Sequence, residues 1–395
     1  MDQPIYLDHN ATTPVFPEVV EAMRACWAEP YLNPASQHAL GRRARRVLED
    51  SRDCIAEMLG ATTSGPAPDR VIFTSGGTEA NNLAIMGCLH AGDRSRPLAS
   101  SQKHLIISAI EHPSINFLFL ADNLARDGWQ ADRLGVDADG VIRVDDLRRL
   151  LRPETRLVAA MLANNETGVL QPVAELAAIC AENRLPLHSD AAQAAGKLPL
   201  AFRELGVATM SIAAHKFGGP LGIGALVVRR DVQLTPQLVG GFQQFGLRPG
   251  TESVALAVGM RRALELWAAN RSKWLSHLQT LRDRFEGALK NRELVILGKG
   301  AARLPNTSNI AFVGLDRQAL FLALDQAGVA CSTGSACASG SSEPSPVHIA
   351  MGCKPAVISS ALRFSFGVAT TLADVEEAAA RIIAICNDLG RQKGR

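Results

Sequence analysis

The sequence predicts an α/β protein with a mainly parallel sheet and a second, smaller α+β domain. Short β-like runs alternate with longer amphipathic stretches, glycine and polar residues follow several of those runs directly, and the pattern changes after about Thr251. The chain has 395 residues, of which 47% are apolar, and its 41 basic and 39 acidic residues leave a net charge of +2. These figures exclude a disordered chain and give no reason to expect a nucleic-acid partner.

The predicted sheet lies in the first two thirds of the chain. Strand-like runs fall at residues 70–74, 104–108, 157–161, 185–189, 210–213 and 224–228. Amphipathic helices are predicted between several of them, at 78–89, 114–127 and 173–183. In a parallel sheet of this kind, ligands bind at the carboxyl ends of the strands, so the residues that follow each strand are the candidates for function.

A different pattern begins after residue 251. A long helix is predicted over 254–290, followed by short β-like runs and two further helices at 317–326 and 372–389. We assign residues 15–255 to a large α/β domain, and residues 1–14 together with 256–395 to a small α+β domain.

The chain has the features of a cytoplasmic protein. It contains no run of about 18 apolar residues, and its first residues lack the basic start and apolar core of a signal peptide. Five of its eight cysteines occur singly in apolar helical patterns, where thiols usually serve as small core residues: Cys26, Cys54, Cys88, Cys180 and Cys386. A disulfide framework is therefore not expected.

A glycine-rich turn at residues 74–79 (TSGGTE) follows a predicted strand and opens a predicted helix. Glycine lets the backbone approach an anion closely, and the first N–H groups of a helix have no partner inside it. The turn therefore predicts a phosphate site at which Gly77 and Thr78 would bind the anion. The spacing fits neither a dinucleotide-binding fingerprint nor a Walker motif, and an ordinary strand–helix turn is the alternative interpretation.

Two further strand ends carry residues suited to a cofactor. Asp190 could hold a heterocyclic nitrogen protonated, although a helix N-cap is the alternative for such a residue. Lys216 lies between an apolar strand and a glycine-rich turn, where partial desolvation would let it form a Schiff base; the alternative is a surface lysine. A phosphate cradle, a strand-end aspartate and a lysine 26 residues beyond it together indicate pyridoxal 5′-phosphate.

Over essentially its whole length the sequence resembles the cysteine desulfurases of the NifS/IscS type, within the class-V, fold-type I enzymes that depend on pyridoxal phosphate. The motifs that carry the resemblance are YLDHNATTP (6–14), NPAS (33–36), SGGT (75–78), EHP (111–113), NNETG (164–168), DAAQ (190–193), HK (215–216), RPGT (248–251), GSAC (334–337) and LRFS (362–365). The resemblance implies the PLP-dependent transferase fold type I.

The resemblance implies a role for each matching residue around the cofactor. Lys216 would bind its aldehyde and later move the substrate Cα proton. Asp190 would pair with the ring nitrogen, Gln193 would contact the phenolic oxygen, and His112 would stack on the ring. The phosphate would be held by Gly77, Thr78 and His215, and by Thr251 from the neighbouring subunit of a homodimer.

The substrate carboxylate would be held by Asn165, which also contacts the cofactor, and by Arg363, whose guanidinium permits bidentate binding. Asn33 would frame the pocket. Other interpretations of single residues remain open: His112 as a capped loop histidine, Arg363 as a structural ion-pair residue, and Asn165 as part of a tight turn.

Cys337 distinguishes this pattern from that of the aminotransferases. It lies in a run of very small residues from 332 to 345, which can bury little apolar area and is therefore expected to be mobile and exposed. The resemblance implies that Cys337 takes sulfur from L-cysteine as a persulfide, in a long loop like that of the desulfurases that supply iron–sulfur scaffolds. The alternatives are an incidental thiol or a metal site shared with Cys331 and Cys353, whose spacing fits no common metal pattern.

Three segments depart from the family pattern. Ala213 stands where a Ser or Thr usually gives the phosphate a hydroxyl, and one lost hydrogen bond to a charged group costs about 1.5–3 kcal/mol. The segment before Thr251 reads QQFGLRPG in place of the usual charged stretch, and residues 343–348 read EPSPVH, where His-Val-Leu is common at the end. These changes concern cofactor affinity, the dimer contact and the base of the loop, not a group that performs chemistry.

We therefore predict a cysteine desulfurase that converts L-cysteine to L-alanine and passes the sulfur from Cys337 to an acceptor such as an iron–sulfur scaffold. No resident metal, nucleic-acid or membrane partner is expected. One rival is a selenocysteine lyase, an aminotransferase or another pyridoxal-phosphate enzyme of this fold. The other rival is a protein without cofactor that only docks partners, for which Ala213 is the supporting feature.

Overall fold

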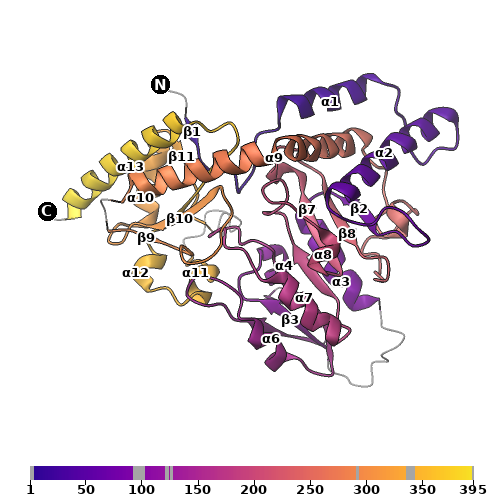
Figure 1. Ribbon diagram of the computed structural model, residues 1–395, viewed down its shortest axis with the longest axis horizontal. Coiled ribbons are helices and arrows are strands. Elements are labelled where there is room, and N and C mark those ends of the chain that lie inside the picture. Colours follow the sequence, from indigo (N-terminus) through magenta and orange to yellow (C-terminus); the bar gives the residue numbers. More distant parts are fainter. Residues whose placement is uncertain are drawn as a thin grey trace.

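The computed structural model describes residues 4–91, 103–120, 124, 128–290, 293–334 and 343–393. Within them, the larger sheet has seven strands in the order β2-β8-β7-β6-β5-β3-β4 (Figure 1). These strands are β2 (Arg70–Thr74), β3 (Lys103–Ser108), β4 (Trp129–Leu134), β5 (Thr155–Ala159), β6 (Leu187–Asp190), β7 (Thr209–Ala213) and β8 (Gly224–Val228). Only β8 runs antiparallel to its neighbours, which confirms the predicted mainly parallel sheet.

The strands differ from the sequence-based expectation in two respects. β5 lies two residues earlier than predicted, and β6 begins two residues later. β4 was not predicted, because its sequence WQADRL mixes polar with apolar residues in the manner of an edge strand and lacks a clear alternation. The bounds of the other predicted strands agree with the structure within one residue. The candidate residues that follow these strands therefore lie at the carboxyl edge of the sheet, as expected.

Helices cover both faces of this sheet because its strands are apolar on both sides. Leu105 and Ile107 pack with Ile85 of α3 (Gly77–His90), on the face that also carries α4 (Pro113–Leu120). Ile106 lies between them in sequence and joins the core on the opposite face, with Leu176 of α7 (Val173–Glu182). The remaining helices of this region are α6 (Val144–Leu150) and α8 (Phe202–Leu205). Residues 121–123 and 125–127 of the predicted helix 114–127 lie outside the described residues.

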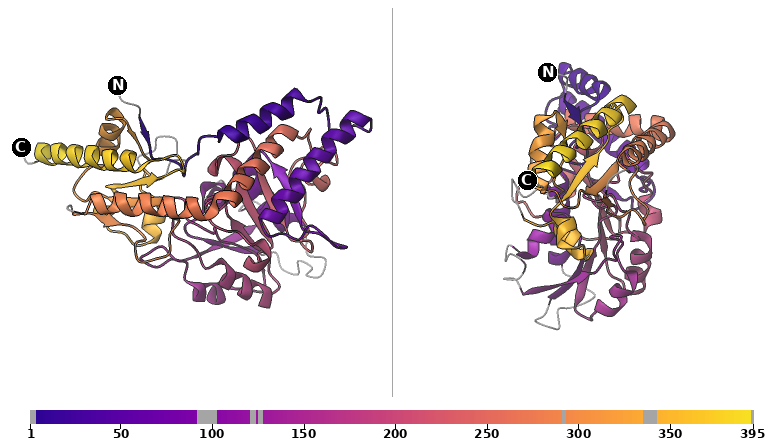
Figure 2. Two further views of the ribbon diagram at one scale, coloured as in Figure 1. Left: turned by 45° about the horizontal axis from the view of Figure 1, so that its top comes forward. Right: turned by 90° about the vertical axis from the view of Figure 1, so that its left-hand side faces the viewer.

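The long helix α9 (Val254–Ala288) joins the two halves of the molecule (Figures 1 and 2). Its first half packs against α1 (Pro17–Ala28) and α2 (Ala39–Met58), and its second half against α13 (Leu372–Lys393). The Ser253 hydroxyl accepts a hydrogen bond from the Leu256 N–H at 3.3 Å and so caps the start of α9.

The second half of the molecule is built on two small sheets. In one, β10 (Thr307–Ala311) lies between β12 (Ala361–Ser365) and β9 (Val295–Ile296), all antiparallel. In the other, β1 (Ile5–Tyr6) pairs in parallel with β11 (Val329–Ala330). A separate hydrophobic core includes Phe285, Phe312 and Phe364 and also Leu7, so the start of the chain belongs to this half. The remaining helices are α10 (Arg317–Gln326), α11 (Pro346–Ala350) and α12 (Pro355–Ile358).

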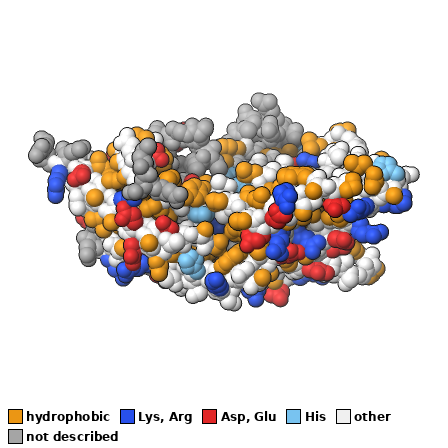
Figure 3. Space-filling model, turned by 90° about the horizontal axis from the view of Figure 1, so that it is seen from above, with side chains coloured by type: hydrophobic (Ala, Val, Ile, Leu, Met, Phe, Trp, Pro, Cys, Tyr) orange, Lys and Arg blue, Asp and Glu red, His pale blue; other side chains and the backbone are white. Residues whose placement is uncertain are grey.

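Acidic and basic side chains are interspersed on the face seen in Figure 3, in line with the small net charge. Among the residues that the structure describes, no helix is long and apolar enough to cross a membrane.

Candidate active site

The predicted functional residues converge at the carboxyl edge of the large sheet. β2, β3, β5, β6 and β7 share one direction, so their ends meet at the same edge. The segments that follow them carry the glycine turn, His112, Asn165, Asp190 and Lys216. Fold topology thus brings together residues that lie more than 100 positions apart.

The glycine turn after β2 opens directly into α3. The Ala80 N–H donates to the Gly76 carbonyl at 3.1 Å, so the N–H groups of Gly77, Thr78 and Glu79 precede the first hydrogen bond of the helix. A Cβ placed on Gly76 would meet no atom within 4 Å, and one on Gly77 would lie 3.5 Å from the Ala213 Cβ. Backbone donors therefore border an open space beside Ala213, as a phosphate cradle requires.

Asp190 is buried at the end of β6, where two donors hold its carboxylate. Oδ1 accepts from the Ala192 N–H at 2.9 Å, and Oδ2 accepts from Asn81 Nδ2 at 2.7 Å. Asp190 is thus a fixed acceptor with capacity to pair with a protonated ring nitrogen.

Asn81, on α3, connects Asp190 with His112. Its Nδ2 also donates to Ser114 Oγ at 2.9 Å, and Ser114 Oγ lies 2.8 Å from Nδ1 of His112. Because Asn81 Nδ2 is the donor in both bonds, Oδ1 is its acceptor, and it lies 3.0 Å from Nε2 of the buried His188. This network holds the strand-end carboxylate and the imidazole of His112 in one arrangement.

Glu111 fixes the backbone from which His112 projects. Its buried carboxylate accepts from the Met161 N–H at 2.7 Å and from the hydroxyl of Ser108. Burial raises the pKa of Glu111 to about 7, although these hydrogen bonds oppose the shift. The turn after β3 is thereby tied to the end of β5.

Lys216 lies in a short 3₁₀ turn (Ala214–Lys216) directly after β7. Its Nζ donates to the carbonyls of Asn10 and Ala11, at 2.8 Å in each case. Nδ1 of His215 lies 3.2 Å from the Thr12 hydroxyl. Burial, reinforced by the charge of Lys216, lowers the pKa of His215 to about 4, so this imidazole is neutral near pH 7. The start of the chain therefore forms one wall of the site.

Gln193 lies on the same wall as Lys216. Its Nε2 donates to the Asn10 carbonyl at 3.0 Å, which is the oxygen that also accepts from Lys216 Nζ. Gln193 is buried, and the amide and the lysine amine meet at a single acceptor.

Arg363 is buried on β12, where the smaller half of the molecule meets the large sheet. Nη2 donates to Asp8 at 2.6 Å and Nη1 to the Asn165 carbonyl at 2.9 Å, whereas Nε has no partner among the described residues. A guanidinium carries five N–H donors, so capacity remains for a carboxylate ligand. The structure thus brings Arg363 and Asn165 together as predicted, and adds Asp8, which pairs with Arg363.

Cys337 lies outside the described residues, but both flanks of its segment are described. On one side, Ser332 and Arg363 exchange backbone hydrogen bonds at 3.0 and 2.7 Å. On the other side, the Ser345 hydroxyl donates to Glu166 at 2.7 Å. The described residues Ser332 and Ser345, on either side of this segment, therefore contact Arg363 and Glu166 respectively.

Cys331 differs from a reactive thiol. It is buried, and burial raises its pKa to about 12. A nucleophilic thiol must ionise, so Cys331 is not suited to relay sulfur. No group of three metal-binding side chains occurs among the described residues, which include Cys331 and Cys353 but not Cys337.

Two predicted residues lie away from this arrangement. Asn33 is exposed between α1 and α2, where its Oδ1 accepts from the Ala35 N–H at 2.9 Å. Thr251 is also exposed, in a segment held against α3 by an ion pair between Arg248 and Glu79 at 2.8 Å. Their roles stay predictions.

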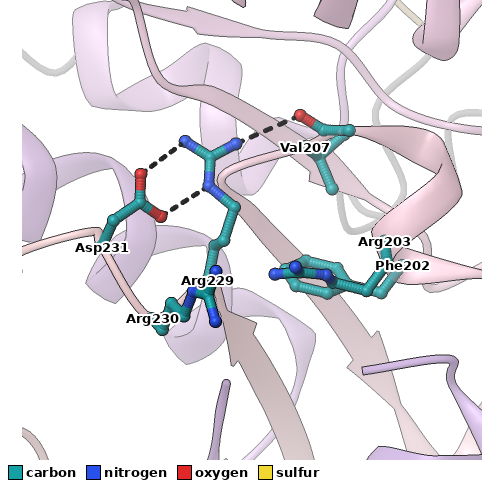
Figure 4. Close-up of a pocket in the computed structure, with 7 residues that line it drawn as sticks. Phe202, Arg203, Val207, Arg229, Arg230 and Asp231 are labelled. Carbon is teal, nitrogen blue, oxygen red and sulfur yellow. Dashed lines mark hydrogen bonds and ion pairs between the residues drawn. The ribbon is translucent and has the colours of Figure 1, made fainter. Parts of the chain in front are cut away.

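A pocket of about 390 Å³ lies at the opposite edge of the large sheet (Figure 4). It is bordered by the segment before β7 and by the residues that follow the antiparallel strand β8. Two of the three arginines that line it are paired: Arg229 with Asp231 at 2.6 Å (Figure 4) and Arg203 with Asp69 at 3.4 Å. It is therefore separate from the candidate active site.

The fold is that of the aminotransferase class-V family, to which the chain belongs: the family matches residues 5–377. Among its relatives are the cysteine desulfurase IscS of Dictyoglomus turgidum, 40% identical over 95% of this chain and 92% of that protein, and an IscS-like cysteine desulfurase of Mycobacterium tuberculosis, 41% identical over 94% of each. The crystal structure of a NifS-like protein from Rickettsia africae aligns with a TM-score of 0.86 and 32% identity, over 98% of this chain and all of that one. These matches confirm the resemblance, the fold class and the class of enzyme predicted from the sequence.

Sequence reasoning missed several residues that build the site. Asn81 lies on α3 one turn after the phosphate motif, and this spacing on a motif helix is the signal that could have identified it. The sequence around Asn10 and Lys197 gives less indication of a role in the site, because Asn10 forms hydrogen bonds with Gln193 and Lys197, which are far away in sequence.

Proposed function

We propose that this enzyme is a cysteine desulfurase that uses pyridoxal 5′-phosphate to convert L-cysteine to L-alanine and leaves the sulfur on Cys337. The observation that carries the proposal is the convergence of Lys216, Asp190, His112 and Arg363 beside the N-terminus of α3. The names of the relatives support the same activity. The summed reaction balances: the substrate and the Cys337 thiol give alanine and a Cys337 persulfide.

The chemistry of the donor set fits pyridoxal phosphate. An open space borders the N–H groups at the start of α3, Asp190 offers a buried carboxylate, and Lys216 offers an amine on the same edge. Gly77, Thr78 and the neutral His215 would hold the phosphate, Asp190 the ring nitrogen, and Gln193 the phenolic oxygen. When bound, pyridoxal phosphate supplies a ring that accepts electrons from the substrate Cα.

The residues of the chain then supply binding and proton transfer. Arg363 and Asn165 would orient the substrate carboxylate, which directs the Cα–H bond toward Lys216. Lys216 Nζ would take the Cα proton and return it to the product, and His112 would handle the proton of the substrate thiol. Asn81 holds His112 and Asp190 in register through the hydrogen bonds already described.

We assign the sulfur-accepting nucleophile to Cys337. The described flanks of its segment support this: Ser332 contacts Arg363, and Ser345 contacts Glu166, the neighbour of Asn165 in sequence. The buried thiol of Cys331, with its raised pKa, is not a competitor. The Cys337 thiolate would attack the substrate sulfur, and the persulfide would then pass to an acceptor, for which an iron–sulfur scaffold protein is our proposal.

We propose a homodimer in which Thr251 reaches the partner's phosphate site. Just before Thr251, Val239 and Phe242 are almost fully exposed, and Leu238 and Phe245 are about half exposed. Exposed apolar side chains gathered in one segment are typical of a protein interface. The large and small domains, divided after residue 255, and the cytoplasmic location stay predictions.

The test is the intact mass of anaerobic protein loaded with pyridoxal phosphate, after brief exposure to L-cysteine, with alanine counted in the same tube. We expect a gain of one sulfur, mapped to Cys337, with matching alanine, and its loss in Cys337→Ser. Bound cofactor without alanine would reject the activity, and a keto acid product would indicate an aminotransferase. Parallel reactions with L-selenocysteine would identify the lyase alternative.

A further inference from the structure

Three residues behind the candidate site form a closed ring of hydrogen bonds. Lys197 Nζ donates to Gln193 Oε1 at 2.8 Å and to Asn10 Oδ1 at 3.0 Å. Gln193 Nε2 donates to the Asn10 carbonyl at 3.0 Å, which closes the ring. None of these bonds is needed to hold the sheet together, and the activity proposed above does not account for Lys197.

The amine at the centre of this ring is deeply buried. Lys197 is only 4% exposed, and among the described residues no carboxylate pairs with it. Its place is set by a helical turn over residues 191–198, in which Gln193 and Lys197 are four positions apart and so share a side. Gly196 has a φ of 69°, and a Cβ there would lie 2.1 Å from the Phe217 Cβ, so this turn fits closely against the Lys216 turn. A buried lysine without a counter-ion is costly and rarely occurs without a task.

The ring is attached directly to the predicted reactive lysine. The Asn10 carbonyl that accepts from Gln193 also accepts from Lys216 Nζ at 2.8 Å. The Asn10 side chain is fixed on its other sides, since Oδ1 accepts from Asn306 at 3.2 Å and Nδ2 donates to Thr307 at 2.9 Å. A displacement of Asn10 would therefore move the acceptor of Lys216.

The chemistry of the lysine amine determines how Gln193 must be turned. The Lys197 amine donates to both Asn10 Oδ1 and Gln193 Oε1, so the amide of Gln193 presents its oxygen to Lys197. The NH₂ group of Gln193 then lies on the other side, where one N–H reaches the Asn10 carbonyl. The second N–H remains for an acceptor such as the phenolic oxygen of the cofactor.

We propose that Lys197 is a positioning residue for the cofactor ring, which fixes the Gln193 amide and the Asn10 carbonyl. The inference rests on the proposed use of pyridoxal phosphate. The charged and titratable groups that face this region are Asp8, His9, His112, Asp190, His215, Lys216 and Arg363. Burial, together with the charges of Lys216 and Arg363, lowers the pKa of Lys197, so its role is that of a hydrogen-bond donor, which a neutral amine also fulfils.

The test compares three variants of the full-length protein loaded with pyridoxal phosphate. Lys197→Met removes the donor, Lys197→Gln keeps a donor, and Lys273→Met is a control at an exposed lysine on α9. The readouts are the pH midpoint of the change in visible absorption, the dissociation constant of pyridoxal phosphate, and the melting temperature of the cofactor-free protein. None of these depends on turnover.

We expect Lys197→Met to weaken cofactor binding by about tenfold and to raise the absorption midpoint, because the Gln193 N–H that would face the phenolic oxygen is no longer held in place. Lys197→Gln should keep an affinity within about threefold of wild type and a midpoint close to that of wild type, because it still donates to Gln193. Lys273→Met should match the wild type.

Folded Lys197→Met protein with an unchanged midpoint and affinity would overturn the inference. If this variant fails to fold, Lys197→Gln decides in its place: it keeps the donor, so a loss of affinity beyond about threefold rejects the role. Wild-type protein that takes up no pyridoxal phosphate would overturn the proposed function, and the inference with it.

Discussion

Replacing Ala213 by serine should strengthen binding of pyridoxal phosphate. The Ala213 Cβ lies 3.5 Å from the position of a Cβ on Gly77, in the turn predicted to hold the phosphate. A hydroxyl at this point would reach the same space as the helix N–H groups. One hydrogen bond to a charged group contributes about 1.5–3 kcal/mol, which corresponds to an affinity gain of about 10- to 100-fold.

The assay is an equilibrium titration of the cofactor-free protein with pyridoxal phosphate, followed by absorption or fluorescence. Titration with pyridoxal, which lacks the phosphate, separates the cradle from the ring contacts, and its affinity should not change. Ala208→Ser is the matched control, because Ala208 is 1% exposed against 2% for Ala213 and precedes β7 at its opposite end.

The result that would refute this reasoning is a folded Ala213→Ser protein whose affinity for pyridoxal phosphate equals or falls below that of the wild type. An equal gain with pyridoxal would also refute it, because the hydroxyl would then act outside the phosphate cradle. An equal gain in Ala208→Ser would attribute the effect to polarity in general.

Three further outcomes follow from the geometry. Arg363→Lys should raise the KM for L-cysteine about 100-fold, since an ammonium cannot bind a carboxylate in bidentate fashion; steady-state alanine assays test this, and an unchanged KM contradicts it. Gly196→Ala should destabilise the cofactor-free protein by about 2–4 kcal/mol in urea unfolding, because its Cβ would collide with Phe217 at a positive φ; wild-type stability would reject the collision. Burial lowers the pKa of His188 from 6.5 to about 4, so the unfolded chain binds a proton below pH 6.5 that the folded chain refuses. The contribution of neutral His188 to the free energy of unfolding is complete above pH 6.5 and is lost as the pH falls toward 4, by at most about 3 kcal/mol. His188→Gln should therefore flatten the dependence of the free energy of unfolding in urea on pH between 7 and 4.5. An unchanged slope would contradict this prediction.

The sequence by itself determined the class of fold and the position of each reactive group along the chain. A glycine turn before a helix, an aspartate that ends a strand and a lysine before a glycine-rich turn are local patterns. Each depends on residues within about one turn or one strand, so it can be read without knowing the rest of the fold. This is why local patterns are enough to assign Gly77, Asp190 and Lys216 to the carboxyl edge of the sheet, where they lie.

The tertiary structure decided which distant groups hold these residues in place. Asn10 meets Lys197 across 187 positions, and Arg363 meets Asp8 across 355. Such contacts produce no repeating pattern in the sequence, because each involves a single polar residue whose partner becomes its neighbour only in the folded chain. The burial of Lys197 follows from the same cause: the surrounding chain segments exclude water only after the sheet, the N-terminal segment and β12 have assembled.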